Sequence, residues 1–219
     1  MISFKQWICI IGISFFLAIP ASAAPVVYTD ETSFITALSG SQSLVDFNSS
    51  SQGPIVGNEF SLQGFIFDSP LAFPLGNLEI APPDPSFAAS NYLNIDERPF
   101  VSGDGDEDDL DIFIQGSWKA VGFRIVDSSI PAPGESITVY DTLNNNIYTR
   151  TTDAIDYFGI IADVPIGKIS INELSDGDDV GYDDFRLGNQ ASTIVPEPAT
   201  MLLLGLGLMG LAGVRRIEK

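Results

Sequence analysis

The stretch DLDIFIQGSWKAVGFRIVD, residues 109–127, decides the fold class of this chain. In its first part Leu110, Ile112 and Ile114 alternate with Asp109 and Asp111, so one face is apolar and the opposite face is acidic. An alternation with a period of two is typical of a strand that buries one face. The second part, residues 119–127, is rich in β-branched and aromatic residues, which also favour strands. The stretch therefore predicts two strands.

Further segments of the same kind follow one another along residues 43–187, with turn residues between them and no helical pattern. About ten short strands at this spacing favour an all-β fold, an antiparallel β-sandwich of jelly-roll type, over a parallel α/β sheet. The predicted strands are 43–47, 64–68, 92–95, 109–114, 119–127, 136–141, 147–152, 157–163, 167–174 and 182–187.

Three other segments have local signals. Thr29 is the expected N-cap of one short helix, whose apolar face carries Phe34, Ile35 and Leu38. The Asn run in 140–150 predicts a tight hairpin, because Asn tolerates positive φ. The Pro-rich tract 69–87 predicts a long connection over the rim, because proline cannot donate a hydrogen bond to a sheet.

The N-terminus has the pattern of a secretory signal peptide. Lys5 precedes an apolar stretch, and Ala21 and Ala23 are the small residues that a signal peptidase reads, so we predict cleavage after Ala23. A short transmembrane anchor is the alternative interpretation. The only cysteine is Cys9, which lies inside this segment, so the mature protein is expected to contain no disulfide.

Composition excludes several classes of function. The formal net charge is −19, and a surface this acidic repels phosphate backbones, so nucleic-acid binding is not expected. The chain contains no histidine, and together with the position of Cys9 this excludes Ser-His-Asp triads, Cys-His triads and histidine zinc sites. We therefore expect a protein that is not an enzyme. A glycosidase that uses two carboxylates stays open as the alternative.

Two acidic clusters, 102–111 and 175–184, are candidate calcium sites. The D-x-D-x-D spacing in the first cluster lets alternate carboxylates converge on one cation, and a bound calcium would relieve the repulsion between neighbouring acids. Solvated turns are the alternative interpretation. The predicted ligands of a structural calcium are Asp104, Asp106, Asp108, Asp176, Asp178, Asp183 and Asp184.

Aromatic side chains on a sheet face or rim are the expected means of binding sugars. In a β-sandwich such residues more often belong to the core, and the sequence does not give their direction. The candidates are Tyr92, Phe100, Trp118, Tyr148 and Tyr157.

The chain ends in three parts in fixed order. Pro196, Glu197 and Pro198 come first, then an apolar segment over 199–214, then Arg215 and Arg216. Sixteen residues make a helix about 24 Å long, just short of the hydrocarbon core of a membrane. We predict a single transmembrane helix over 199–214, with its basic end in the cytoplasm by the positive-inside rule. A buried core helix is the alternative.

These last residues resemble the PEP-CTERM sorting signal of exported bacterial proteins. The resemblance implies that a membrane-embedded exosortase, a transpeptidase similar to cysteine proteases, recognises Pro196, Glu197 and Pro198 and releases or transfers the preceding domain. It also implies a Gram-negative bacterium that makes exopolysaccharide and biofilm matrix. The basic tip departs slightly, because it ends Ile217-Glu218-Lys219. Segments such as AVGFRIVD and FGIIADVPIGKISI resemble uncharacterised β-sandwich domains that carry such tails.

Together these features predict a signal peptide over 1–23, a β-sandwich over 24–188, a linker over 189–195 and a sorting signal over 196–219. The expected function is that of an exported surface or matrix protein associated with exopolysaccharide. Its expected partners are signal peptidase, exosortase, the membrane before processing, and polysaccharide. A carbohydrate-active enzyme and a purely structural spacer are the alternatives.

Overall fold

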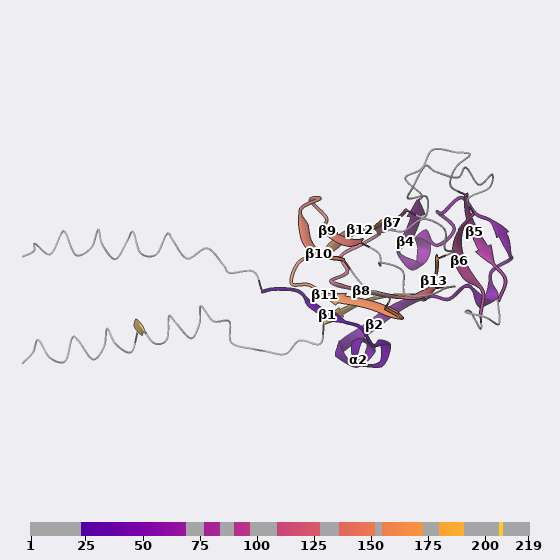
Figure 1. The fold of residues 1–219 in the computed structure, drawn as a ribbon. Coiled ribbons are helices and arrows are strands. Elements are labelled where there is room, and N and C mark those ends of the chain that lie inside the picture. The colour runs from indigo at the N-terminus through magenta and orange to yellow at the C-terminus, as the bar shows by residue number, and fades with distance from the viewer. Residues whose placement is uncertain are drawn as a thin grey trace, which may run out of the picture. The chain divides into compact units, whose positions relative to one another are not determined.

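The computed structural model describes residues 23–68, 77–83, 90–96, 109–127, 136–151, 155–172, 180–190 and 206–207 (Figure 1). The chain divides into two units, one over Ala24–Ser192 and one that combines Met1–Ala23 with Thr193–Lys219. Of the predicted transmembrane segment only Leu206 and Gly207 are described, and both are helical. Among the described residues, no helix has the length and apolar character needed to cross a membrane.

The described part of Ala24–Ser192 is mostly β, with antiparallel strands and one α-helix, which confirms the predicted class. The helix is α2 (Glu31–Ala37), and two 3-10 turns, η1 (Phe47–Ser49) and η2 (Ser61–Gln63), lie between early strands. The strands are β1 (Val26–Tyr28), β2 (Leu38–Val45), β3 (Gly53–Pro54), β4 (Phe65–Asp68), β5 (Asn77–Ala81), β6 (Tyr92–Asp96), β7 (Leu110–Ile114), β8 (Ala120–Asp127), β9 (Ser136–Asp141), β10 (Asn146–Thr151), β11 (Tyr157–Ile161), β12 (Ile166–Asn172) and β13 (Val180–Gln190).

The described strands form two antiparallel sheets. The eight-stranded sheet has the order β1-β11-β8-β13-β6-β5-β3, and β2 also pairs with β13. The five-stranded sheet has the order β10-β9-β12-β7-β4. Strands that neighbour one another in these orders are mostly distant in sequence, so the pairing depends on long-range contacts.

The two sheets pack against one shared core (Figure 1). Phe67 of β4 and Phe185 of β13 belong to different sheets, and their ring centroids lie 4.8 Å apart. At the other end of the core, the ring centroids of Tyr148 of β10 and Phe158 of β11 lie 6.2 Å apart. Leu110, Ile112 and Ile114 are buried, so the apolar face of β7 faces the core, as predicted. Hydrophobic burial between the sheets is thus the main stabilising contribution.

Helix α2 lies on the outer face of the eight-stranded sheet, away from the five-stranded sheet (Figure 1). The prediction that Thr29 caps it was wrong by one residue, because the Asp30 side chain accepts a hydrogen bond from the Ser33 amide at 2.8 Å. Leu38 was also wrongly assigned to the helix, since β2 begins there. The same early region shows that the predicted strand 43–47 ends at Val45, and that Phe47 begins a 3-10 turn.

The Pro-rich tract is not a continuous connection, which corrects another prediction. Residues 77–81 form β5, which pairs with β6 and β3. The prolines of the tract lie on either side of this segment and not within it, so each of its residues keeps a backbone N–H. The short edge strand β1 was also missed. The predicted hairpin is confirmed: β9 and β10 pair across a turn in which Asn144 has φ 63°.

Candidate functional site

Most of the predicted site residues lie outside the described residues. Ala23 is described and exposed. The undescribed processing residues are Ala21, Pro196, Glu197, Pro198, Arg215 and Arg216, and the undescribed calcium candidates are Asp104, Asp106, Asp108, Asp176 and Asp178. Of the predicted calcium ligands, Asp183 and Asp184 belong to the described residues.

Asp183 lies where β13 changes partner. On one side β13 pairs with β8 over most of its length, with one extra residue between Asp183 and Arg186. On its other side it pairs with β6 through Gly181 and Tyr182, and then with β2 from Phe185 onward. Such a bulge leaves backbone groups without ladder partners. We call the place between Tyr182 and Phe185, where β13 changes from β6 to β2, the fork. The side chain of Asp183 lies at this fork and is only 2% exposed.

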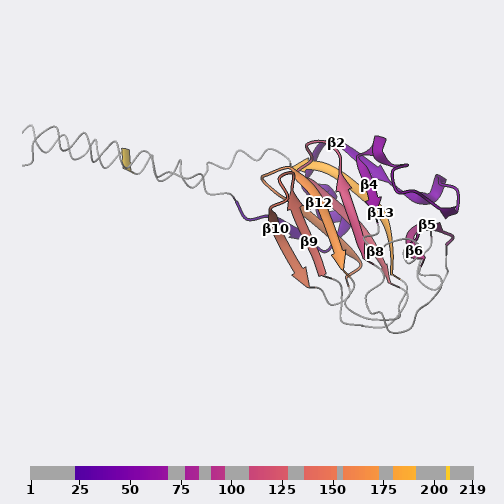
Figure 2. The same cartoon turned by 90° about the horizontal axis from the view of Figure 1, so that it is seen from above.

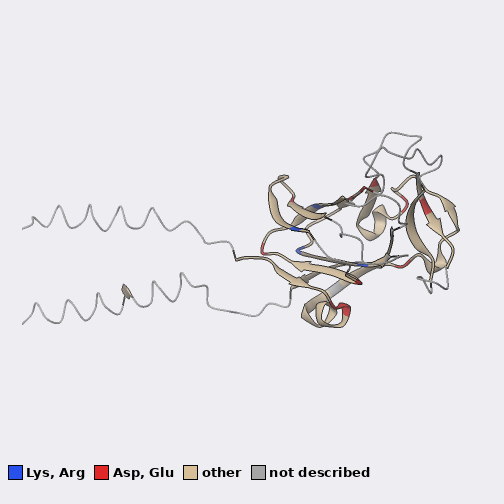
Figure 3. Ribbon diagram, viewed as in Figure 1, with Lys and Arg blue, Asp and Glu red and all other residues tan. Residues whose placement is uncertain are grey.

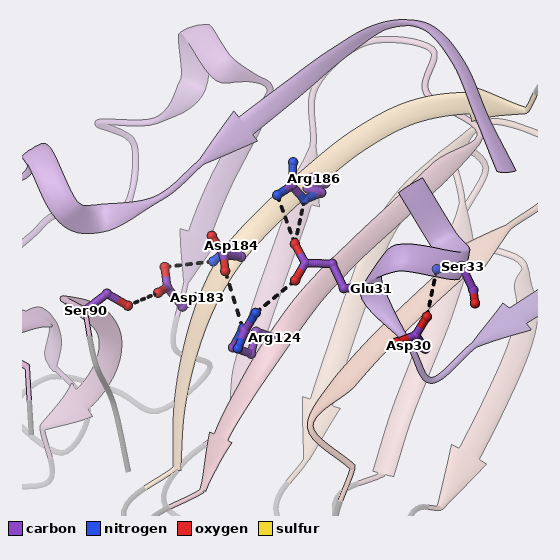
Figure 4. A network of polar contacts seen from close by, with 8 residues as sticks. All are labelled: Asp30, Glu31, Ser33, Ser90, Arg124, Asp183, Asp184 and Arg186. Carbon is purple, nitrogen blue, oxygen red and sulfur yellow. Dashed lines mark hydrogen bonds and ion pairs between the residues drawn. The ribbon is translucent and has the colours of Figure 1, made fainter. Parts of the chain in front are cut away.

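The carboxylate of Asp183 accepts hydrogen bonds from groups next to β6 and β2, and from the following residue of β13 (Figure 4). The Ser90 hydroxyl, which precedes β6, donates to Oδ2 at 2.6 Å, and the Asp184 amide donates to Oδ1 at 2.7 Å. The Phe47 amide, which follows β2, also donates to it. Burial raises the pKa of Asp183 above its ordinary value, and the hydrogen bonds oppose this rise. The carboxylate thus ties the ends of β2 and β6 to β13.

Asp184 belongs to a different network, on the outer face of the eight-stranded sheet (Figure 4). It has φ 52°, and its Oδ2 lies 3.4 Å from Nε of Arg124. Glu31 of α2 accepts from Nη2 of Arg124 at 2.9 Å and from Nη2 of Arg186 at 2.9 Å. Burial and the Glu31 charge raise the pKa of Asp184, whereas the two arginines lower it. Two acids and two bases are therefore paired beside α2.

The calcium site predicted at Asp183 and Asp184 stays a prediction. The two carboxylates are adjacent in sequence, yet they bind different partners, Ser90 in one case and Arg124 in the other. Within the described ranges there is no group of three or more acidic side chains that could hold a metal ion. We interpret both networks as structural.

Most of the predicted sugar-binding aromatics belong to the core. Tyr92 and Tyr157 are buried, and Trp118 and Tyr148 are half-buried and packed against the core cluster. Phe100 lies outside the described residues. Two aromatics that the sequence did not single out, Phe113 and Tyr140, do reach the surface of a sheet. The alternation of β7 was the available signal, because it placed Phe113 on the acidic face with Asp109 and Asp111.

Phe113 and Tyr140 lie on the outer face of the five-stranded sheet, because they alternate with the buried residues Ile112 and Val139. Figure 2 views this sheet from in front. Lys168 of β12 pairs with Phe113 of β7 on one side and with Tyr140 of β9 on the other. Its Nζ lies 5.9 Å from the Phe113 ring centroid and 5.0 Å from the Tyr140 ring centroid. Both distances suit cation–π attraction. We call these three residues the ring row.

A second set of side chains runs parallel to the ring row. Asp111, Ser170, Thr138 and Thr149 are register partners across β7, β12, β9 and β10, and we call them the polar row. Ser170 donates to Oδ1 of Asp111 at 2.5 Å, and Lys168 donates to Oδ2 at 3.1 Å. The Thr149 hydroxyl lies 3.4 Å from that of Thr138. No described helix covers these rows.

Comparison with known proteins identifies one segment. Residues 195–216 match the PEP-CTERM protein-sorting motif. This confirms the resemblance of the C-terminal segment and implies an exported protein that is sorted by an exosortase to the cell surface or extracellular space. No curated protein sequence matches the chain. One solved structure, titled "Carbohydrate binding module family29", aligns with 73% of this chain and 97% of its own, at 12% identity and a TM-score of 0.36. At that score the similarity carries no argument.

Proposed function

We propose that this chain is an exosortase-processed, non-enzymatic protein of the cell surface or extracellular matrix, and that it associates with matrix polysaccharide. The observation that carries the proposal is the sorting motif over 195–216. The working part is the two-sheet domain, which we take to be a β-sandwich of jelly-roll type. Its strongly acidic composition suits a soluble matrix component and disfavours nucleic acid as a partner.

The proposed route has two cleavages. Signal peptidase removes residues 1–23, and the apolar segment 199–214 then holds the chain in the membrane with Arg215 and Arg216 on the cytoplasmic side. Exosortase recognises Pro196, Glu197 and Pro198 and separates the domain from this anchor. The membrane contact is therefore temporary in this proposal, and the cell is a Gram-negative bacterium.

The chemistry of the available side chains supports a binding role over catalysis. The chain has no histidine, and its one cysteine lies in the predicted signal peptide. The carboxylates of Glu31 and Asp184 are held by arginines, and that of Asp183 by Ser90. A glycosidase needs one carboxylic acid and one free carboxylate that face a sugar.

A structural calcium in the two acidic clusters is part of the proposal as well. Thermal melting of the protein with and without a chelator tests it, and an unchanged midpoint would count against the calcium.

The experiment that tests the route is mass spectrometry of the mature protein from cells with and without the exosortase. The expected mature form begins at Ala24 and ends near Pro196 in wild-type cells. In cells without the exosortase the expected form keeps its C-terminal segment and stays with the membrane fraction. A full-length C-terminus in wild-type cells would contradict the proposal.

A further inference from the structure

We infer that the outer face of the five-stranded sheet is the polysaccharide-binding surface, and that its occupant is an uncharged polysaccharide chain. This inference rests on the proposed function and names the surface and the class of ligand. It concerns the ring row of Phe113, Lys168 and Tyr140 and the polar row beside it.

The ring row offers two aromatic surfaces at a defined separation. Phe113 is 36% exposed, and Tyr140 lies half-buried on the far side of Lys168. The two residues stand on β7 and β9, with β12 between them, so they lie about 10 Å apart. This separation is comparable to the length of two linked pyranose rings in an extended chain. The C–H face of a pyranose is apolar and packs against an aromatic ring, so two rings at this spacing suit a chain and not only a single sugar.

The polar row supplies hydrogen-bonding groups along the same direction. Ser170, Thr138 and Thr149 present hydroxyls, and Asn172 adds an amide that donates to Asp109 at 2.9 Å. Hydroxyls can donate and accept, so they match the hydroxyls of an uncharged sugar without requiring a charge on the ligand. An extended polysaccharide chain that lies along the ring row, across the strands, would have the polar row along one edge.

The charges of the face exclude an anionic chain. Lys168 is the base on these rows, and its ammonium already pairs with Asp111 at 3.1 Å. Asp68 pairs in register with Asp111, and Asp109 bonds to Asn172, so acids border the rows. The whole chain carries −19, and the described bases are few and spread over strands of both sheets (Figure 3). A uronic-acid polymer would therefore be repelled, whereas an uncharged polymer would not.

The face is also held in place before any ligand arrives. Asp111 accepts from both Ser170 and Lys168, and Lys168 in turn lies between the two rings. Side chains that are already ordered lose little conformational entropy when a ligand binds. Lys168 is only 23% exposed, which agrees with this confinement. The side chains of the two rows are therefore largely ordered before a ligand binds.

The test is affinity electrophoresis of the mature protein, purified as its own cells export it. The gels contain either uncharged polymers (hydroxyethylcellulose, a mixed-linkage β-glucan, a galactomannan) or anionic ones (alginate, hyaluronan). We expect retardation by at least one uncharged polymer and by neither anionic one. We expect Phe113→Ala and Tyr140→Ala each to weaken retention at least about tenfold. Leu62→Ala is the matched control, because Leu62 is 98% exposed, lies in η2 and belongs to neither row.

Thr138→Arg is the second variant, in case truncation of a ring impairs folding. It places a long side chain across the polar row, and we expect it to abolish retention while circular dichroism stays unchanged. Retardation by anionic polymers alone, or by no polymer, would overturn the inference. So would equal retention of wild type and all three row variants. Dimerisation lost in Tyr140→Ala, without sugar binding, would assign the face to a second copy instead. Terminal mass spectrometry on the same samples separates these outcomes from a failure of the sorting route.

Discussion

On the outer face of the eight-stranded sheet α2 places Phe34 over two glycines, whereas on the outer face of the five-stranded sheet Phe113 lies beside Lys168 with no described helix above it. A Cβ at Gly159 would lie 2.7 Å from the Phe34 ring, and one at Gly122 would lie 2.8 Å from it. The eight-stranded sheet therefore receives its helix because glycine leaves room for a ring. The corresponding outward positions of the five-stranded sheet carry Ile66, Phe113, Lys168 and Tyr140, whose side chains leave no such room.

The largest effect should come from one substitution made on both faces. Phe34→Ala removes a ring that is 0% exposed and contacts Tyr28 and Tyr157, so we expect the free energy of unfolding to fall by about 3–5 kcal/mol. Phe113→Ala removes a ring at the surface, and we expect a loss of about 1 kcal/mol or less. Denaturant unfolding of both variants measures the difference. Equal losses would mean that the two faces are not distinct in stability.

A second pair compares one acid from each sheet. Asp183→Ala leaves the Ser90 hydroxyl and the amides of Asp184 and Phe47 without their acceptor, so we expect a loss of about 2–4 kcal/mol. Asp111→Ala, on the five-stranded face, removes partly exposed contacts, and we expect about 1 kcal/mol. Denaturant unfolding again gives both values. A small loss at Asp183 would show that water replaces the carboxylate at the fork.

The pH dependence of stability sharpens the same contrast. Burial raises the pKa of Asp183 in the folded state, so its contribution is fully present below the unfolded pKa and is lost as pH rises through the folded pKa. Asp183→Asn stays neutral at every pH. We therefore expect the stability difference between wild type and Asp183→Asn to shift in favour of the variant as the pH rises above the ordinary pKa of an aspartate, about 4. Unfolding curves at intermediate pH values measure this shift, and a pH-independent difference would contradict it.

Ion pairs should have a smaller effect. Glu31→Gln removes the charge that holds Arg124 and Arg186, and because the site is partly exposed we expect a loss of about 1 kcal/mol or less. High salt should reduce the difference from wild type. Lys168→Gln, which breaks the ion pair on the other face, is the matched variant. An effect of Glu31→Gln that is larger and independent of salt would point to packing of α2 and not to charge.

The smallest expected effects are local, at two exposed turns. Hydrogen bonds from Ser33 lower the pKa of Asp30, and those from Asn145 lower the pKa of Asp141. A lowered folded pKa means that the contribution is present above the unfolded pKa and is lost as pH falls through the folded pKa. In proton NMR the amide chemical shifts of Ser33 and Asn145 should follow the titration of Asp30 and Asp141, with midpoints below the ordinary pKa of an aspartate. A midpoint within that range at either turn would contradict the hydrogen bonds seen there.

Sequence patterns predicted most of the strands that form the core, but few of the contacts on the outer faces of the sheets. Alternation in β7 and the turn residues before β10 depend on neighbours in the chain, so they can be read locally. The hydrogen bonds of Asp183 could not be read in this way, because Ser90 and Phe47 are distant in sequence. The ring row has the same limitation: Phe113, Tyr140 and Lys168 come together only through the register of three strands. The missed β5 had a local signal, since its five residues contain no proline.

Strand β13 pairs with β8, β6 and β2, and it is the last of the described strands. A chain that leaves the cell N-terminus first presents all three partners before residues 180–190 have emerged. The eight-stranded sheet then stays divided, and the fork at Asp183 stays unfilled, until export of the domain is nearly finished. Folding of the eight-stranded sheet can therefore be completed only after residues 180–190 have emerged.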